Sequence, residues 1–235
     1  MKILAIIPAR SDSKGVPGKN TKILGDKPLV HYTINIANQI NEFDDVILST
    51  DSEKIAEIGL KLGVSVPFLR SPDLSKDETP MFDVIEDVVN YYNKKNKNFD
   101  AFCLMQPTVP FRKVDVVKKC LKKFISSNDY SSFFSVREVP SKYNPHWVFK
   151  EDNNRLSLFK NGLGVISRRQ ELPNTFYRDG DIYLFHYKTF KNEKSIYTES
   201  NNFLVNDYAP YVNIDNLEDW KKAEKLLERY VNENL

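Results

Sequence analysis

Cysteine, glycine and long apolar runs are scarce in this sequence, and its charges nearly cancel. Its 235 residues include two cysteines and eight glycines, and the formal net charge is +2. No apolar run approaches the ~20 residues that a membrane-spanning helix needs, so we expect no membrane partner. Pro8 and Arg10 interrupt the first apolar run, which is therefore not the core of a signal peptide, and the cytoplasm is the expected compartment.

The scarcity of cysteine and of net charge excludes two further classes of protein. Cys103 falls in a predicted strand and Cys120 in a predicted helix, and we expect buried thiols there rather than a disulfide or a metal pair. A net charge near zero, without a basic block among aromatic residues, is not typical of nucleic-acid-binding proteins. We therefore expect no nucleic-acid partner.

Two common phosphate-binding fingerprints are also absent. Residues 13–20 read S-K-G-V-P-G-K-N, which lacks both the first glycine and the final hydroxyl residue of a P-loop. The dinucleotide fingerprint G-x-G-x-x-G is missing as well. A nucleotide site in this chain therefore requires a different loop.

A buried strand followed directly by a cationic loop opens the sequence. Residues 3–7 form a short apolar run rich in isoleucine, which is typical of a parallel strand covered on both faces. The loop after it contains two glycines, whose backbone N–H groups can turn toward a ligand, and the cations Arg10, Lys14 and Lys19. Such a loop at a strand end suits a polyphosphate. A surface turn with solvated charges is the alternative.

Strands and helices alternate along most of the chain. This alternation predicts βαβ units and a doubly wound, mostly parallel sheet in a single α/β domain over residues 1–235. Further predicted strands are 45–50, 64–69, 99–105 and 133–139, and the predicted helices are 28–39, 52–62, 81–92, 114–125 and 217–231. After residue 139 the alternation gives way to an irregular, aromatic stretch.

The cationic loop also carries a resemblance to a known family. I-P-A-R at 7–10, S-K-G at 13–15, Pro17 and K-N at 19–20 resemble the signature I-P-A-R-x-x-S-K-G-x-P-x-K-N of the acylneuraminate cytidylyltransferases, the CMP-sialic acid synthetases. Further matches extend over nearly the whole chain. The resemblance implies a Rossmann-like fold of the nucleotide-diphospho-sugar transferase type. It also implies that CTP and an acidic 2-keto sugar are the substrates.

The resemblance implies a nucleotide pocket built from two segments. From the first, the implied nucleotide contacts are Ala9, Arg10, Ser13, Lys14, Gly15, Lys19 and Asn20. Among these, Arg10 and Lys19 are the implied catalytic residues, since cations stabilise a triphosphate and its leaving pyrophosphate. The second segment resembles the family's F-L-R…L-x-x-D-x-T and contributes Arg70, Asp77 and Thr79. A turn that opens the next helix is the alternative role for Asp77 and Thr79.

The implied sugar contacts lie on the segment Q-P-T-V-P-F-R at 106–112 and beyond residue 140. They are Gln106, Lys142, Arg169, Arg178 and Tyr183. Arginine suits a carboxylated sugar, because its planar fork matches a carboxylate in two parallel hydrogen bonds. Asp179 and Asp181 add two carboxylates beside Arg178, and they could pair with it and orient it, or alter the choice of sugar.

The irregular stretch at about 140–178 is implied to be an inserted arm that embraces a second subunit. Its exposed aromatic residues beside basic ones are what such an interface needs, so a homodimer is the expected assembly. A hairpin that caps its own subunit is the alternative.

Asn213 and Asp215 stand where the family has D-I-D, whose carboxylates hold magnesium. Alternation along a strand would place both side chains on one face, where both could reach one Mg²⁺ or Mn²⁺ ion. Asparagine contributes a neutral and weaker oxygen ligand. Asp215 is thereby the third implied catalytic residue. Its rival role is to cap the last helix, with Glu218 completing a capping box, although Asn216 could cap instead.

The expected reaction is transfer of a cytidylyl group to a sialic acid or related nonulosonic acid, giving a CMP-sugar and pyrophosphate. One alternative is a related enzyme that uses GTP or another ulosonic acid, such as legionaminic, pseudaminic or 3-deoxy-octulosonic acid. A hexose-1-phosphate nucleotidyltransferase is disfavoured by the paired arginines. The non-enzymatic alternative is a catalytically weak nucleotide-binding module whose metal site has decayed at Asn213.

Overall fold

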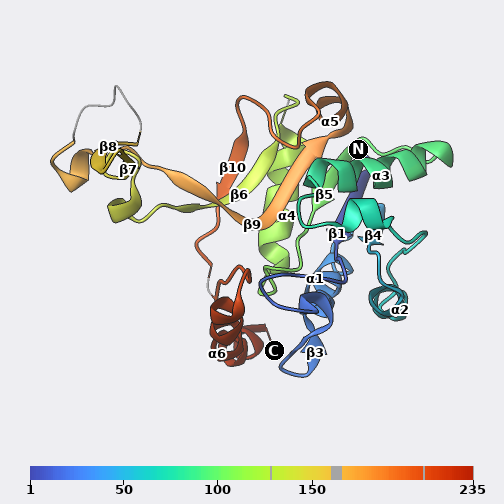
Figure 1. Ribbon diagram of the computed structural model, residues 1–235. Coiled ribbons are helices and arrows are strands. Elements are labelled where there is room, and N and C mark those ends of the chain that lie inside the picture. The colour runs from blue at the N-terminus through green and yellow to red at the C-terminus, as the bar shows by residue number, and fades with distance from the viewer. Residues whose placement is uncertain (128, 160–165, 209, 235) are drawn as a thin grey trace.

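A computed structural model shows a central mixed sheet with helices on both faces (Figure 1). The structure describes residues 1–127, 129–159, 166–208 and 210–234, with side chains through Arg229. The sheet has the order β10–β6–β9–β5–β1–β4, and β9 is antiparallel to both of its neighbours. Its strands are β1 (Ile3–Pro8), β4 (Asp45–Ser49), β5 (Ala101–Leu104), β6 (Phe133–Glu138), β9 (Phe176–His186) and β10 (Asn202–Val205).

Six α-helices and several short elements surround this sheet among the described residues. The helices are α1 (Leu29–Ala37), α2 (Glu53–Lys61), α3 (Met81–Lys94), α4 (Val114–Ser126), α5 (Tyr187–Glu193) and α6 (Leu217–Asn234). The short elements are η1 (Lys19–Thr21), η2 (Pro72–Ser75), η3 (Ser141–Tyr143), η4 (Arg169–Glu171) and the ribbon of β2 (Ile23–Leu24) with β3 (Lys27–Pro28). None of the helices described is long and apolar enough to cross a membrane.

The first strand is buried on both faces. Ile3, Ala5 and Ile7 pack against residues of α1, α2 and α4, whereas Leu4 and Ile6 pack against α3 and α5. Successive side chains of a strand point to opposite faces, so an uninterrupted apolar run requires cover on both sides. This burial on both faces fixes the position of β1 in the sheet, and therefore the point at which the loop after it begins.

The C-terminal helix α6 fastens that loop from outside the sheet. Trp220 and Ala223 of α6 form a buried cluster with Val16 of the loop and with Phe111 beyond β5. Residues separated by some 200 positions in the chain thus share one small core beside the carboxyl ends of the strands.

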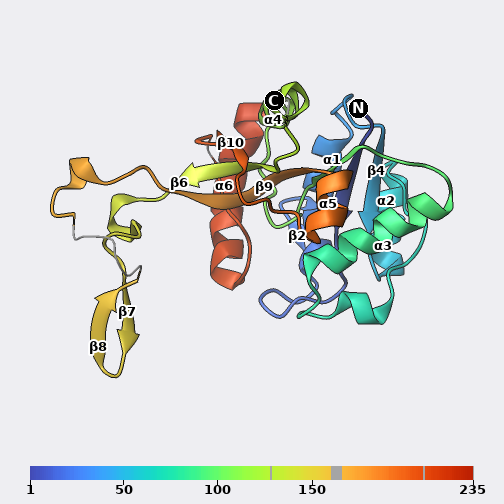
Figure 2. The same cartoon turned by 90° about the horizontal axis from the view of Figure 1, so that it is seen from above.

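A narrow hairpin lies at the far end of an arm that extends from the central sheet in both views (Figures 1 and 2). It consists of β7 (Phe149–Asp152) and β8 (Arg155–Leu158), joined through Asn153 and Asn154 with φ of 50° and 61°. Asparagine is one of the few residues that adopt this left-handed conformation readily. Phe149 is 57% exposed and Leu156 is 72% exposed, so these hairpin side chains lack apolar cover from the part of the chain that the structure describes.

The predicted doubly wound, mostly parallel sheet is confirmed, and two local predictions are wrong. Residues 64–69 form no strand, because Ser65 makes an isolated bridge to Ile47 and Pro67 then offers no N–H to continue it. The strand that was expected to align Asn213 with Asp215 is a loop over residues 211–215, anchored where the Ile214 N–H donates to the Thr108 carbonyl at 2.8 Å. The predicted burial of Cys103 and Cys120 as free thiols is confirmed.

Candidate active site

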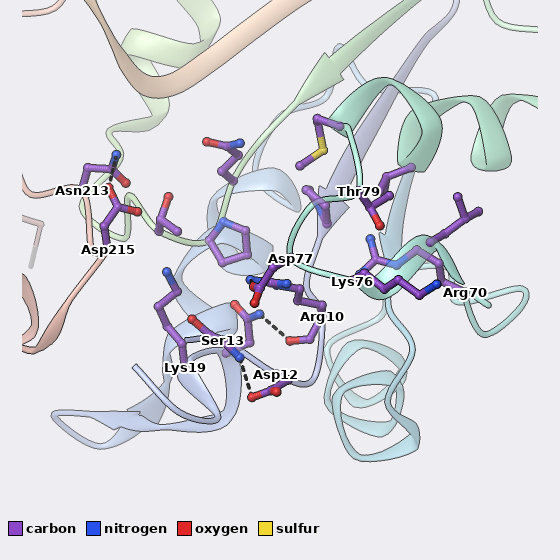
Figure 3. A pocket seen from close by; sticks show the side chains of 18 residues that line it. Arg10, Asp12, Ser13, Lys19, Arg70, Lys76, Asp77, Thr79, Asn213 and Asp215 are labelled. Carbon is purple, nitrogen blue, oxygen red and sulfur yellow. Dashed lines mark hydrogen bonds and ion pairs between the residues drawn. The ribbon is translucent and has the colours of Figure 1, made fainter. Parts of the chain in front are cut away.

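The carboxyl ends of β1 and β5 border a cavity of about 280 Å³ (Figure 3). Parallel neighbours in a sheet end at the same edge, so the loops that follow them meet there. The residues singled out in the sequence that line this cavity are Arg10, Ser13, Lys19, Asn20, Arg70, Asp77, Thr79, Gln106, Asn213 and Asp215. The structure therefore gathers four separate segments around one space.

The loop after β1 is held in shape by its own polar groups. The Asn20 side chain is 6% exposed, and its amide donates to the Arg10 carbonyl at 2.8 Å. The Asp12 carboxylate accepts from the Ser13 N–H at 2.8 Å. Ala9 lies buried below the loop, where its N–H donates to the Ser49 carbonyl at 2.9 Å. Asn20 thus closes this loop at the position where a P-loop carries a hydroxyl residue.

Gly15 brings the loop into direct contact with the C-terminal segment. A Cβ atom at Gly15 would lie 1.8 Å from the carbonyl oxygen of Asp215 and 3.5 Å from the Cα of Asn216. Since both neighbours are backbone atoms, they cannot rotate away as a flexible side chain would. The absence of a side chain at Gly15 therefore permits the cationic loop to lie against the acidic segment, residues 213–219.

We expect Gly15→Ala to separate these two segments, with loss of both stability and nucleotide binding. The overlap must be relieved by backbone movement, and overpacking of this kind costs ~1–3 kcal/mol or more in the free energy of unfolding. Thermal unfolding and CTP titration measure the two effects. Gly63→Asn is the matched control, because Gly63 has a φ of +81° with open space around it and asparagine tolerates that conformation. An unaffected Gly15→Ala protein would contradict the close packing.

Asp77 engages two cations of the loop at once. Its carboxylate forms an ion pair with Arg10 and another with Lys14, the latter at 2.9 Å. The Lys14 ammonium and then the Arg10 guanidinium lower the pKa of Asp77, whose carboxylate in turn raises the pKa of Lys14. A carboxylate repels phosphate, so Asp77 is placed to hold the cations rather than to bind a nucleotide directly. Thr79 donates to the Asp73 carbonyl at 3.2 Å and stabilises the same turn.

Lys19 points across the cavity toward the acidic segment (Figure 3). Its ammonium group donates to the Ile214 carbonyl at 2.7 Å. Burial lowers the pKa of Lys19, and the nearby Asp215 carboxylate partly opposes this shift. A partly desolvated cation interacts more strongly with an incoming anion than a fully hydrated one does.

Arg70 forms the opposite wall together with apolar side chains. It is 5% exposed, its Nε donates to Ser75 Oγ at 3.2 Å, and its guanidinium lies 4.0 Å from the Asp51 carboxylate. Burial lowers the pKa of Arg70, and Asp51 opposes that shift. Leu74, Met81 and Val84 line the cavity beside it. This half of the cavity combines a buried donor with apolar surface, which suits a nucleobase.

Asn213 and Asp215 face the cavity although no strand aligns them. The Asn213 amide donates to the Asp215 carboxylate at 3.4 Å, whereas Asn213 Oδ1 is buried and has no hydrogen-bond partner among the described residues. Asn216 caps α6 in place of Asp215, since its Oδ1 accepts from the N–H groups of Glu218 and Asp219. The proposed capping box from Asp215 to Glu218 is therefore wrong, and the Asp215 carboxylate remains turned to the cavity.

The remaining predicted contacts lie outside the cavity in this chain. Arg169 Nε donates to Ser141 Oγ at 3.0 Å within the arm, beside Lys142. The Arg178 guanidinium lies over the Tyr197 ring, 4.7 Å from its centroid. Tyr183 is buried in the core against Phe134, with ring centroids 5.5 Å apart. Their contacts with a sugar stay predictions.

The pairing of Arg178 with the neighbouring carboxylates is wrong. Asp181 instead forms an ion pair with the buried Arg112 at 2.7 Å, and Asp179 accepts from Ser135 Oγ at 2.6 Å. Both carboxylates point into the core because side chains of β9 alternate, and Arg178 projects the other way.

Three polar side chains that line the cavity were not predicted from the sequence, namely Asp12, Lys76 and Thr108. Asp12 and Lys76 stand at positions marked x in the two quoted signatures, so the resemblance assigned them no role. Thr108 belongs to the segment after β5, where only Gln106 was assigned. Arg112 ends that same segment and was left without a role, although it proves to be fully buried.

Comparison with known proteins identifies the family. A family model described as cytidylyltransferase matches residues 4–234. The chain belongs to the cytidylyltransferase family. The CMP-N,N'-diacetyllegionaminic acid synthase of Legionella pneumophila is 35% identical over 230 residues, covering 97% of both chains. The pseudaminic acid cytidylyltransferase of Campylobacter jejuni is 31% identical over 226 residues, covering 96% of both.

A third relative and two solved structures complete the comparison. The N-acylneuraminate cytidylyltransferase of Streptococcus agalactiae is 34% identical over 200 residues, which are 84% of this cytidylyltransferase and 46% of that protein. A CMP:2-keto-3-deoxy-manno-octonic acid synthetase complexed with CTP has a TM-score of 0.71 at 17% identity, covering 97% and 99% of the two chains. A 4-diphosphocytidyl-2C-methyl-D-erythritol synthase has a TM-score of 0.66 at 12% identity, covering 96% and 98%. The two structures establish the nucleotidyltransferase fold.

Proposed function

We propose that this cytidylyltransferase activates a nonulosonic acid with CTP, producing a CMP-sugar and pyrophosphate. The observation that carries the proposal is the cavity in which Arg10 and Lys19 face the Asn213–Asp215 pair. A hydroxyl group on the anomeric carbon of the sugar attacks the α-phosphorus of CTP, the bond to the β-phosphate breaks, and the hydroxyl proton is lost. Relatives at 31–35% identity are named for legionaminic, pseudaminic and acylneuraminic acids, which supports an acidic nine-carbon sugar.

The cationic loop performs most of the charge stabilisation in this scheme. Backbone N–H groups of the loop and the Lys19 ammonium bind the triphosphate, and Arg10 neutralises charge that develops on the leaving pyrophosphate. Asp77 keeps Arg10 and Lys14 in place before the nucleotide arrives. Arg70 and the apolar wall accept the base. Phosphoryl-type transfer depends chiefly on such positioning and charge neutralisation.

We also propose Mg²⁺, or Mn²⁺, as the cofactor. The donor set fits a hard cation, because the unpartnered Asn213 Oδ1 lies beside the Asp215 carboxylate and magnesium binds through few protein oxygens plus substrate phosphates. When bound, the ion supplies charge stabilisation to the phosphates. No cluster of three or more His, Cys, Asp or Glu side chains exists among the described residues that would hold a metal without the nucleotide.

The arm at about 140–178 supports a homodimer in which it contacts a second copy. Its hairpin exposes Phe149 and Leu156, and two further exposed aromatic side chains, Phe176 and Phe203, pack against each other at the base of the arm with ring centroids 5.2 Å apart. Lys142 and Arg169 lie in the arm, away from their own cavity, so a partner's cavity is where they would meet a sugar carboxylate. Analytical ultracentrifugation tests this assembly.

Pyrophosphate release tests the proposed function directly. The purified protein is incubated with Mg²⁺, each of CTP, GTP, ATP and UTP, and a panel of N,N'-diacetyllegionaminic, pseudaminic, N-acetylneuraminic and 3-deoxy-octulosonic acids. We expect release with CTP and a nine-carbon acid, and a CMP-sugar by mass spectrometry. Release with GTP alone would reassign the nucleotide. Nucleotide binding by thermal shift without any release across the panel would favour the non-enzymatic module.

A further inference from the structure

A buried polar cluster lies directly beneath the wall of the cavity that carries Gln106. Arg112, Asp179 and Asp181 are 1%, 0% and 4% exposed, which is unusual for three ionisable side chains in one place. They come from two segments, the chain after β5 and the middle of β9. None of them reaches the cavity surface, so none has a role in substrate binding as described so far.

The Arg112 guanidinium holds both ends of the turn after β5. One terminal nitrogen donates to the Gln106 carbonyl and the other to the Val109 carbonyl, each at 2.6 Å. The second of these nitrogens also donates to Thr33 Oγ1 at 2.8 Å, on α1. A planar fork with five donors can span these acceptors, whereas a lysine ammonium cannot. Arg112 therefore sets where the backbone of residue 106 lies.

Asp181 in turn sets where Arg112 lies. Its carboxylate pairs with Arg112 Nε at 2.7 Å, and its own carbonyl accepts from the same nitrogen at 3.0 Å. The Asn206 amide donates to the carboxylates of both Asp179 and Asp181, at 2.8 and 3.0 Å. Burial raises the pKa of Asp181 to about 6, and the adjacent Arg112 guanidinium opposes this shift.

The residue between these carboxylates, Gly180, lies near two amide side chains of the cavity. A Cβ atom at Gly180 would lie 3.7 Å from Gln106 Oε1 and 3.7 Å from Asn213 Nδ2. The Tyr211 hydroxyl also donates to the Asp179 carbonyl at 2.7 Å, which ties the segment before Asn213 to the same turn. The space beside Gly180, which a larger residue would occupy, is thus bordered by the amide groups of Gln106 and Asn213.

We propose that Arg112 and Asp181 are positioning residues for the transfer reaction, holding the Gln106 turn and the backbone at Gly180 so that the two amides face the substrates. This inference rests on the proposed function only in assigning Gln106 and Asn213 to substrate and metal. Neither Arg112 nor Asp181 touches substrate; both act through the side chains above them.

Asp181→Asn is the most specific test, because it removes the negative charge of the side chain and keeps its shape. Gln106→Ala identifies the substrate that Gln106 contacts, because it should raise the KM for that substrate. We expect Asp181→Asn to raise the same KM about ten- to a hundredfold, the usual effect of losing one hydrogen bond to a charged group, and to leave the other KM unchanged. In the double variant the two effects should not add, since the second change has no ordered Gln106 left to disturb. Arg112→Lys should reproduce the pattern.

Tyr92→Phe is the matched control for lost stability. It removes a remote hydrogen bond, from the Tyr92 hydroxyl to the Asp45 carboxylate at 3.0 Å, and should leave both KM values unchanged. A merely structural role for Asp181 would lower kcat through the folded fraction without moving either KM. That result, full additivity in the double variant, or no effect of Gln106→Ala on either KM would overturn the inference.

Hydrogen exchange gives a readout that does not need turnover. In Asp181→Asn we expect faster exchange of the Val109 and Ile214 amides, which donate within this turn and to it, and unchanged exchange in β1 and β4. Unchanged exchange at Val109 and Ile214 would overturn the inference even in a protein without activity. Failure of the wild-type protein to release pyrophosphate would instead count against the proposed function.

Discussion

Lys19→Ala should reduce turnover by at least ~10²–10³-fold, the usual effect of removing one preorganised group that stabilises transition-state charge. Lys19 is a partly buried cation that faces the cavity, and its ammonium group already donates to the Ile214 carbonyl on the acidic side. The fold should survive, since the alanine leaves a space open to the cavity rather than a void in the core. Steady-state pyrophosphate release and thermal unfolding measure the two properties.

Lys22→Ala is the matched control for charge on the same loop. Lys22 lies three residues along, with its ammonium 5.0 Å from the centre of the Trp220 ring, and does not line the cavity. Its replacement should leave kcat close to wild type. Normal turnover by Lys19→Ala would remove Lys19 from the mechanism.

The pH profile supplies a second signature of Lys19. Burial lowers its pKa from the ordinary value of 10.5, and only the protonated form attracts the triphosphate. Activity that depends on this ammonium is present below its pKa and lost as the pH rises through it, so kcat/KM for CTP should fall at a lower pH than for an ordinary lysine. In Lys19→Arg the guanidinium stays protonated, and the decline should move to higher pH.

Asp215→Asn is the second change with a large expected effect. It replaces the carboxylate that faces the cavity with a neutral amide, leaving only neutral oxygens at positions 213 and 215. We expect kcat to fall ~10²–10³-fold and the half-saturating Mg²⁺ concentration to rise. Turnover against Mg²⁺ concentration measures both, and Mn²⁺ binding in the presence of CTP, followed by electron paramagnetic resonance, reports the affinity without turnover.

Two further variants serve as comparisons for Asp215→Asn. Asn213→Asp should lower the half-saturating Mg²⁺ concentration, because a second carboxylate strengthens a hard-cation site. Glu218→Gln changes an exposed carboxylate at the start of α6 and should alter neither quantity. Metal affinity that is equal in the wild type and in Asp215→Asn would exclude Asp215 as a ligand.

Local features of the sequence were enough to predict most of the sheet and the cationic loop. The apolar run of β1 is complete within six residues, and the loop signature is contiguous. Both can therefore be recognised without knowledge of distant contacts. The strand expected at 64–69 does not form, because a strand also needs pairing partners elsewhere in the chain. Its composition suits a strand, but only one residue finds a partner, beside Ile47, before Pro67.

The antiparallel β9 shows what adjacency in the chain cannot predict. It lies between β5 and β6 although it follows β6 by nearly 40 residues, and this insertion brings Asp179 and Asp181 into the core. From the sequence alone, the nearest cation to these carboxylates was Arg178, one position away from Asp179. In the folded chain the partner of Asp181 is Arg112, 69 positions away.

The sequence by itself determined the family and the identity of the cations at the end of β1, because both are found in one contiguous signature. It also determined the sheet class, through the alternation of strands and helices along the chain. Only the tertiary structure decided that Asp77 pairs with Arg10 and Lys14, that Asn216 rather than Asp215 caps α6, and that Arg112 is buried under Gln106. Electrostatic pairing and burial depend on distances in space, and a folded chain sets those distances through contacts between residues far apart in sequence.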